Sequence, residues 1–312
     1  MPLLSTRRLL MAKTETTYAT DSSPVEASNS MLVRNLEITP LEAETVSRDL
    51  VRPFLGHADQ LLASEKVAIS FEVEYAGSGT AGTAPAYGPL LEACRCTETI
   101  VASTSVTYAP NSAASPESVT IYFKNDGVLH KATGCRGSFS LSCEVGQIPA
   151  ITFSMVGIYS APTDVAISGP TYSDQDAPLV FKNGNTTGFQ IFSYAGALQS
   201  VSFDVANDVV YRELVGGSKA INIVNRAPAG ECVIEATTIA QHNFFNDATG
   251  ASTGNLTFAH GTTAGNIVTF TAAQIDLGGP SYSDSDGIQQ LTLPYIATPT
   301  SAGNNEFSIA YT

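Results

Sequence analysis

The chain has 312 residues, of which 43% are hydrophobic and 14% are charged, and its formal net charge at pH 7 is −14. This length suits two domains of ordinary size, and a composition rich in Val, Ile, Thr and Tyr favours strands over helices. The negative charge argues against a protein that grips nucleic-acid phosphates with clusters of Lys and Arg. No run approaches the ~18 apolar residues of a membrane span, so we expect a soluble chain that does not contact a membrane.

The chain begins with a polar arm. Residues 1–30 are mostly small and polar after a short leucine-rich start, and nothing in them encloses a core. We expect this arm either to be disordered or to dock on another subunit. A strand is predicted for 31–40, and the mixed, polar segment 41–56 fits a long projecting loop better than a helical turn.

The segment 64–103 organises the first half. Apolar and polar residues alternate at period two from Val67 to Glu74, which predicts a strand with one buried face. The loop 76–87 consists largely of Gly, Ala and Thr, and Gly88-Pro89 then opens a short helix. Ordering such a loop costs roughly 1–2 kcal/mol per residue, so we expect contacts with a neighbouring subunit to offset that cost.

Turn signals and alternation predict the remaining strands. Asp126-Gly127 marks a hairpin over 118–133, since glycine supplies the positive φ of a tight turn. In a second pair over 137–158, Phe139 and Leu141 alternate with serines, so one face should be buried and the other wet. We also predict a short helix at 238–247 and strands at 105–109, 188–194, 200–206, 209–214, 220–225, 231–236, 255–259, 267–275, 290–296 and 306–311.

The sequence contains an internal repeat. Gly-Pro-Thr-Tyr-Ser-Asp-Gln-Asp at 169–176 recurs as Gly-Pro-Ser-Tyr-Ser-Asp-Ser-Asp at 279–286. The strand pair around Gly146-Gln147 matches the pair around Gly265-Asn266, and the segment 32–51 parallels 200–215. We therefore expect a mainly β fold of two tandem β-sandwich or barrel domains, each with a short flanking helix: an arm over 1–30, a first domain over 31–163 and a second over 164–312.

Chemical motifs are weak in this chain. The Gly-x-Gly-x-x-Gly run at 77–82 does not fit a dinucleotide fold, because Pro85 and Pro89 delay the helix that should start inside it. Tandem Asx turns explain the Asp-rich repeats better than a calcium loop does, since the closing Glu is missing. The histidines are scattered, and the five cysteines fit buried free thiols. We expect no catalytic residues, no metal site and no cofactor.

The order of these segments resembles the tail tube (major tail) proteins of long-tailed bacteriophages over nearly the whole length. No single segment is specific, but their succession along one chain is. The segments that carry the resemblance are 8–13 (RLLMAK), 36–56 with Arg48-Asp49-Leu50-Val51-Arg52-Pro53, 71–74 (FEVE), 76–82, 84–91, 127–137, 226–235, 261–265 and 280–287.

This resemblance implies a structural virion protein of the tail, assembled in the host cytoplasm. Its subunits would join strands into a continuous inner barrel, and stacked rings would form the conduit for DNA ejection. The implied partners are other copies of the chain, the tape-measure protein, the tail tip and tail terminator proteins, and double-stranded DNA that passes without specific binding. The acidic balance then suggests a lumen lined with Asp and Glu. Two tube-like domains per chain would give a trimeric ring with pseudo-sixfold symmetry, and a simple hexamer stays open.

The same resemblance identifies candidate contacts between subunits. The arm 1–30 and the inter-ring loops 41–63 and 76–89 should be ordered by neighbours. The residues predicted to make these contacts are Arg8, Leu9, Arg48, Arg52, Phe54, Gly77, Gly79, Gly82 and Tyr87. The alternative is a β-sandwich binding or decoration module on the virion surface, although such a module commonly exposes aromatic side chains and this chain has no Trp.

Overall fold

The computed structural model describes residues 3–312, so the first two residues of the predicted arm lie outside the described part. The chain is mainly β, as its composition predicts, and α1 (Glu26–Asn29), α2 (Gly88–Ala93) and α3 (Phe244–Thr249) are short. The strands are β1 (Arg8–Thr14), β2 (Ser30–Met31), β3 (Arg34–Ser47), β4 (Gln60–Glu74), β5 (Cys96–Val101), β6 (Ser105–Pro110), β7 (Val119–Asn125), β8 (Val128–Glu144), β9 (Ala150–Asp164), β10 (Thr186–Ile191), β11 (Leu198–Asp204), β12 (Asn207–Arg212), β13 (Ala220–Arg226), β14 (Ala229–Glu235), β15 (Thr253–His260), β16 (Val268–Leu277), β17 (Ser281–Ser285), β18 (Ile288–Ala297) and β19 (Ser308–Tyr311).

A long antiparallel sheet organises the molecule. Its strands lie in the order β3-β4-β9-β8-β11-β14-β18-β17, and each neighbouring pair is hydrogen-bonded. Side chains alternate between its two faces: Phe139 and Leu141 of β8 are buried, whereas Ser142 between Leu141 and the next buried position is exposed. The buried and wet faces predicted for this strand are therefore confirmed.

A second layer packs on the apolar face of the long sheet. It contains the strands β5-β6-β19-β16-β15-β10 and the pair β1–β7, which continues into β8. Phe203 of β11 packs on Phe270 of β16 with ring centroids 4.9 Å apart. Phe139 contacts both Phe203 and Phe307, at 6.4 and 5.9 Å. One apolar core thus runs through both halves of the chain.

The long sheet consists of two four-stranded units with the same topology, β3-β4-β9-β8 and β11-β14-β18-β17. In each unit the first two strands extend into a hairpin, directly in β3–β4 and through β12–β13 in the second unit. A short helix, α2 or α3, follows the second strand of each unit. Within the chain, β8 and β11 join the units from Glu144↔Ser200 to Ser140↔Asp204.

This topology corrects two equivalences that the sequence repeat predicted. The strand that occupies the place of β9 is β18, not β16, because β18 pairs with β14 as β9 pairs with β4. The two Gly-Pro-x-Tyr-Ser-Asp copies also differ: 281–285 forms β17, whereas 169–176 contains no strand. The backbone of the first copy is engaged elsewhere, since Asp174 O accepts from Ala86 N and Asp176 N donates to Gly77 O.

The predicted arm is part of the fold. β1 pairs with β7 over its full length, from Arg8↔Asn125 to Thr14↔Val119. Four consecutive residues of β1, Leu9 to Ala12, are buried. The expectation that this segment is disordered or docks on another subunit is therefore wrong for 8–14, whose apolar residues supply core side chains.

The glycine-rich loop 76–89 is also ordered by its own chain. Gly77 N donates to Asn266 Oδ1 at 2.7 Å, and Gly79 N donates to Gly265 O at 3.0 Å. Gly82 has a φ of +76°, and a Cβ there would lie 2.3 Å from Ser103 N. The loop packs so closely that no side chain fits at Gly77 or Gly82, and the expectation that a neighbour must order it is wrong.

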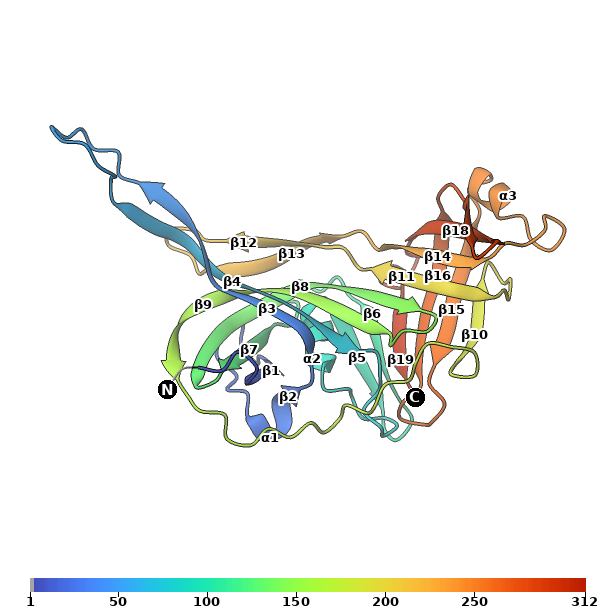
Figure 1. Cartoon of the computed structure of the whole chain (residues 1–312), viewed down its shortest axis with the longest axis horizontal. Coiled ribbons are helices and arrows are strands. Elements are labelled where there is room, and N and C mark those ends of the chain that lie inside the picture. Colours follow the sequence, from blue (N-terminus) through green and yellow to red (C-terminus); the bar gives the residue numbers. More distant parts are fainter. Residues whose placement is uncertain (1–2) are drawn as a thin grey trace.

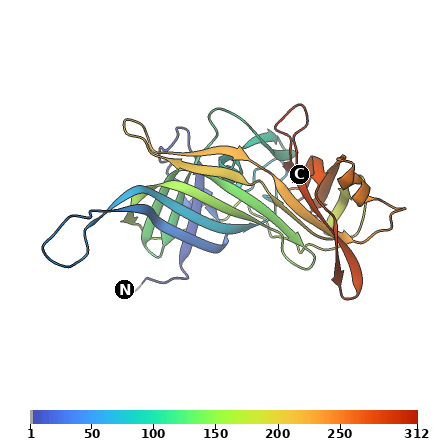
Figure 2. The same cartoon turned by 90° about the horizontal axis from the view of Figure 1, so that it is seen from above.

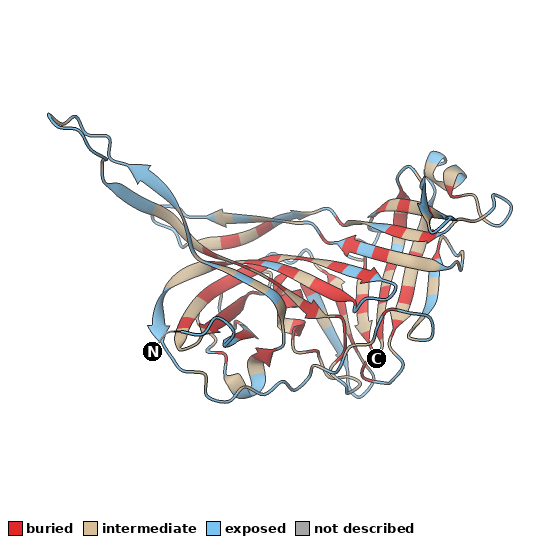
Figure 3. Cartoon of the chain, in the orientation of Figure 1, coloured by how far each residue is buried: buried red, intermediate tan, exposed pale blue. Residues whose placement is uncertain are grey.

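About half of the predicted loop 41–63 belongs to the paired strands of a β-hairpin. β3 and β4 remain paired as far as Ser47↔Gln60, so only 48–59 lacks strand structure. This hairpin projects well beyond the body (Figure 1), and the β12–β13 hairpin extends toward the same side in both views (Figures 1 and 2). Figure 3 shows that the outer part of the β3–β4 hairpin is largely exposed, in contrast to the buried core of the body.

Candidate assembly surfaces

The tip of the β3–β4 hairpin is an exposed apolar surface. Val51 and Leu55 are fully exposed, at 104% and 103%, and Phe54 is 66% exposed. Next to these side chains, an ion pair links the two sides of the tip: Arg48 Nη1 lies 3.6 Å from Asp59 Oδ2. Exposed apolar side chains on an extended arm contribute no burial free energy to the isolated chain. Contiguous exposed apolar surface marks interaction sites.

The β12–β13 hairpin carries a matching tip. Leu214 is 53% exposed and Val215 is 109% exposed, close to the values of 56% for Leu50 and 104% for Val51. Arg-Glu-Leu-Val at 212–215 corresponds to Arg-Asp-Leu-Val at 48–51, and each run ends in an exposed Leu-Val pair. The contact residues predicted from the sequence do not include Leu214 and Val215, although the parallel between 32–51 and 200–215 indicates them.

Two strands at the ends of the long sheet have a free edge. Among the described residues, β3 pairs only with β4, and β17 pairs only with β18. One backbone group on the β3 edge, Leu36 O, accepts a hydrogen bond from Arg8 Nη1 at 3.3 Å. An open edge presents backbone groups that can add a strand from another chain.

The outer face of the long sheet is polar and acidic. The side chains that alternate with the buried ones are mostly Ser, Thr and carboxylates. Among the basic residues on this face, Arg34 and Lys66 are paired with Glu72 and Glu42 at 3.4 and 3.1 Å, and Arg136 is covered by β13, whose Ile221 O accepts from its Nη1. The acidic residues that point to this side are Glu37, Glu42, Glu72, Glu74, Glu144, Asp204, Glu231 and Glu235.

The structure separates the predicted contact residues into two groups. Arg48, Arg52 and Phe54 lie together at the β3–β4 tip, where the Arg52 guanidinium is 6.0 Å from the centroid of the Phe54 ring. Arg8 is exposed on β1. These side chains are free to meet a neighbour.

The other predicted contact residues differ in burial: Leu9, Gly77 and Tyr87 are buried, Gly82 is half-buried and Gly79 is exposed. Leu9 is 3% exposed and packs with Met11, Tyr122 and Leu129. Tyr87 is fully buried and donates to Ala76 O at 2.8 Å; burial raises the pKa of its hydroxyl. Gly77, Gly79 and Gly82 form the close backbone contacts described above. The side chains of Leu9 and Tyr87 are therefore used in the packing of their own chain, whereas the backbone of Gly79 remains accessible.

The described residues contain no group of three or more His, Cys, Asp or Glu side chains placed to hold a metal ion. No helix in this part of the chain is long and apolar enough to cross a membrane. The cavities of the body are lined by mixed polar and apolar side chains from several strands.

Comparison with known families gives the surfaces their context. The model of one family, described as phage tail tube protein, matches residues 5–297. No curated protein matches the chain in sequence. The match extends from β1 to the end of β18 and includes both hairpins and both free edges. The chain belongs to the phage tail tube protein family, and it is a structural, β-rich component of the bacteriophage virion tail.

Proposed function

We propose that the chain forms closed rings in which β17 of one copy pairs with β3 of the next, and that these rings stack into the tube through which DNA leaves the virion. The observation that carries this proposal is the β8–β11 joint inside the chain. It pairs β8, the last strand of the first four-stranded unit, with β11, the first strand of the second unit. The free edges at the ends of the sheet are the equivalent strands: β17 is the last strand of the second unit, and β3 is the first strand of the first unit.

The register of the proposed joint follows from the internal one. Glu74 and Glu235 are the last residues of β4 and β14, and they pair with Ala150 and Gln290. With these strands aligned, β17 corresponds to 140–144 of β8, and β3 corresponds to β11. The observed pairs Ser142↔Ser202, Leu141↔Phe203 and Ser140↔Asp204 then predict Ser283↔Glu37, Tyr282↔Ile38 and Ser281↔Thr39 between neighbouring copies.

The number of chains in a ring depends on the repeat. If each four-stranded unit takes one of six places, three chains close the barrel, and closure leaves no exposed edge. The two tandem domains over 31–163 and 164–312 would thus act as two quasi-equivalent subunits. The similar hairpins, tips and helices of the two units support a trimer with pseudo-sixfold symmetry over a simple hexamer.

The two projecting hairpins supply the contacts between rings. Each carries an exposed Leu-Val pair beyond the body of the sheet. Burial of one such side chain contributes about 1.5–3 kcal/mol, and a ring of three chains would bury several tips at once. Arg48, Arg52 and Phe54 would belong to this surface.

The acidic outer face of the long sheet is proposed as the wall of the lumen. Carboxylates on a closed barrel repel the phosphates of DNA, which therefore slides without binding. The tape-measure protein would occupy the same channel before ejection, and tail tip and terminator proteins would cap its ends. The role is structural and involves no enzymatic reaction.

Cysteine cross-linking tests the joint and its stoichiometry. Glu37→Cys and Ser283→Cys in one chain should form interchain disulfides on oxidation, with a ladder that ends at three chains. The matched control combines Ser283→Cys with Ile38→Cys, whose side chains face opposite sides of the sheet and should not link. Electron microscopy of the wild type should reveal hollow tubes of uniform width, whereas discrete particles would favour the decoration module. Equal cross-linking of both pairs would contradict the proposed register.

A further inference from the structure

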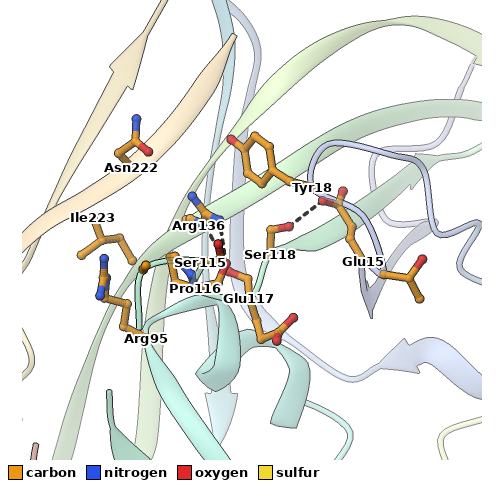
Figure 4. A pocket seen from close by; sticks show the side chains of 12 residues that line it. Glu15, Tyr18, Arg95, Ser115, Pro116, Glu117, Ser118, Arg136, Asn222 and Ile223 are labelled. Atoms are coloured by element: carbon orange, nitrogen blue, oxygen red, sulfur yellow. Dashed lines mark hydrogen bonds between the residues drawn. The ribbon is translucent and has the colours of Figure 1, made fainter. Parts of the chain in front are cut away.

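Three arginines gather at the β12–β13 hairpin, but only Arg226, the last residue of β13, has a carboxylate partner. Arg226 lies 2.8 Å from Glu306, with which it forms an ion pair. Arg95 and Arg136 form no ion pair within residues 3–312. Both line a cavity of about 380 Å³ between the hairpin and the segment 114–118 (Figure 4).

Arg136 is 6% exposed and is held by neutral groups. Its Nε, Nη1 and Nη2 donate to the backbone oxygens of Glu117, Ile221 and Pro116 at 3.2, 2.7 and 2.6 Å. The ring of Tyr18 lies 4.4 Å from the guanidinium carbon. These contacts fix the orientation of the guanidinium without neutralising its charge, which is the arrangement of a preorganised anion site.

Arg95 occupies an unfavourable position. It follows α2 with a φ of +65°, where glycine is the usual residue. Its Nε is buried without an acceptor, and its Nη1 has one long contact to Ala113 O at 3.3 Å. Burial lowers the pKa of Arg95, and the charge of Arg226 lowers it further. A strained backbone, an unsatisfied donor and neighbouring positive charges are tolerated where function requires them.

Two carboxylates, those of Glu15 and Glu117, line the cavity, but neither forms an ion pair with Arg95 or Arg136 among the described residues. Glu15 already accepts from Ser118 Oγ, Thr120 Oγ1, and the backbone N–H groups of Ala19 and Gly134. Glu117 is exposed, and Figure 4 shows its carboxylate directed away from Arg95. The cavity therefore holds one firmly bound guanidinium, that of Arg136, a second one with few contacts, that of Arg95, and room for a side chain.

We propose that this cavity binds the carboxylate of an Asp or Glu side chain from a second copy of the chain, clamped between Arg95 and Arg136. The chain carries 29 acidic residues against 15 basic ones, so a second copy is a ready source of carboxylates. The inference rests on the proposed self-assembly, and it adds an electrostatic lock to contacts that are otherwise strand pairing and apolar tips.

The variant Arg95→Gly separates a contact role from an internal one. It relieves the backbone strain and removes the unpaired charge, so the Tm of the chain below its assembly concentration should rise by roughly 1–3 °C. The concentration needed for tube assembly should nevertheless rise about tenfold, and it should depend less on NaCl. The variant Arg95→Lys keeps the charge, and the concentration at which it assembles should lie between those of the wild type and Arg95→Gly.

Three results would overturn the inference. Tubes that form from Arg95→Gly at the wild-type concentration would exclude the contact, and a lower Tm would assign Arg95 an internal structural role. Stabilisation of the wild type, but not of Arg95→Gly, by millimolar inorganic phosphate at constant ionic strength, with unchanged assembly, would assign the cavity to a free anion. If the wild type itself forms no tubes, the proposed function fails as well, which distinguishes that failure from the failure of this site alone.

Discussion

The buried carboxylate of Glu26 should be among the strongest polar determinants of stability in this chain. Its side chain is 9% exposed and pairs with Lys124, which is 7% exposed. It also accepts from Ser168 N and Gly169 N at 2.7 and 2.8 Å. One carboxylate thus fastens the segment after β9 to β7 and to the N-terminal part of the chain.

We expect Glu26→Gln to lower the free energy of unfolding by about 3 kcal/mol. Removing one member of a buried ion pair costs about 3–5 kcal/mol, and the remaining amide oxygen can keep part of the hydrogen bonding to Ser168 and Gly169. The control Glu42→Gln removes a surface pair with Lys66, in which the Glu42 side chain is 48% exposed. That change should stay within about 0.5 kcal/mol.

The effect should also depend on pH. Burial raises the pKa of Glu26, but the hydrogen bonds from Lys124, Ser168 and Gly169 outweigh it and leave the pKa below its ordinary value. The stabilisation is therefore complete above about pH 4.5, the ordinary value. It is lost as the pH falls through the lowered pKa of the folded state. Urea unfolding at pH 7 and pH 3 measures both results. Equal free energies for Glu26→Gln and Glu42→Gln at pH 7 would refute the reasoning.

Three further predictions follow from the surfaces and the core. The double variant Val51→Ser, Leu55→Ser should impair tube assembly in electron micrographs while the urea midpoint of the free chain stays unchanged; a shifted midpoint would mean that the tip packs on its own chain. Gly82→Ala should destabilise by more than 2 kcal/mol because of its clash, whereas Gly216→Ala, with a φ of +79° and open space around it, should cost only about 1 kcal/mol, as urea unfolding can compare. Burial raises the pKa of the Cys96 thiol to about 12, so a thiol reagent should modify it at pH 8 only after unfolding, and rapid reaction of the native chain would contradict its burial.

Local sequence signals predicted much of the long sheet. Alternation from Val67 to Glu74 identified the inner part of β4, and Asp126-Gly127 identified the β7–β8 turn, where both residues have positive φ. Such features depend on neighbours along the chain. β17 was predicted only as a repeated motif, because Ser281–Ser285 has no buried apolar face and is a strand solely through its pairing with β18.

Long-range contacts explain the errors. The loop 76–89 looked unsupported because its partners, Asp174, Gly265 and Asn266, lie far away in the sequence. The cavity of Arg95 and Arg136 could not be recognised for the same reason, since the hairpin above it comes more than 80 residues later, as the Arg136–Ile221 hydrogen bond illustrates. Of the apolar side chains at the tips, only Phe54 is among the predicted contact residues, and Leu50 and Val51 lie in a segment that carries the family resemblance.

The pairing of β6 with β19 has a consequence for biosynthesis. These strands are separated by about 200 residues, with Val106 opposite Tyr311, so β6 stays exposed on one side during most of translation. Closing so large a loop slows folding and prolongs the lifetime of aggregation-prone intermediates. In the proposed assembly, a nascent chain in which β6 is still unpaired on one side lacks a complete second layer, so we expect it to join a tube only after β19 has docked. Maturation of each molecule would thus be completed before polymerisation begins.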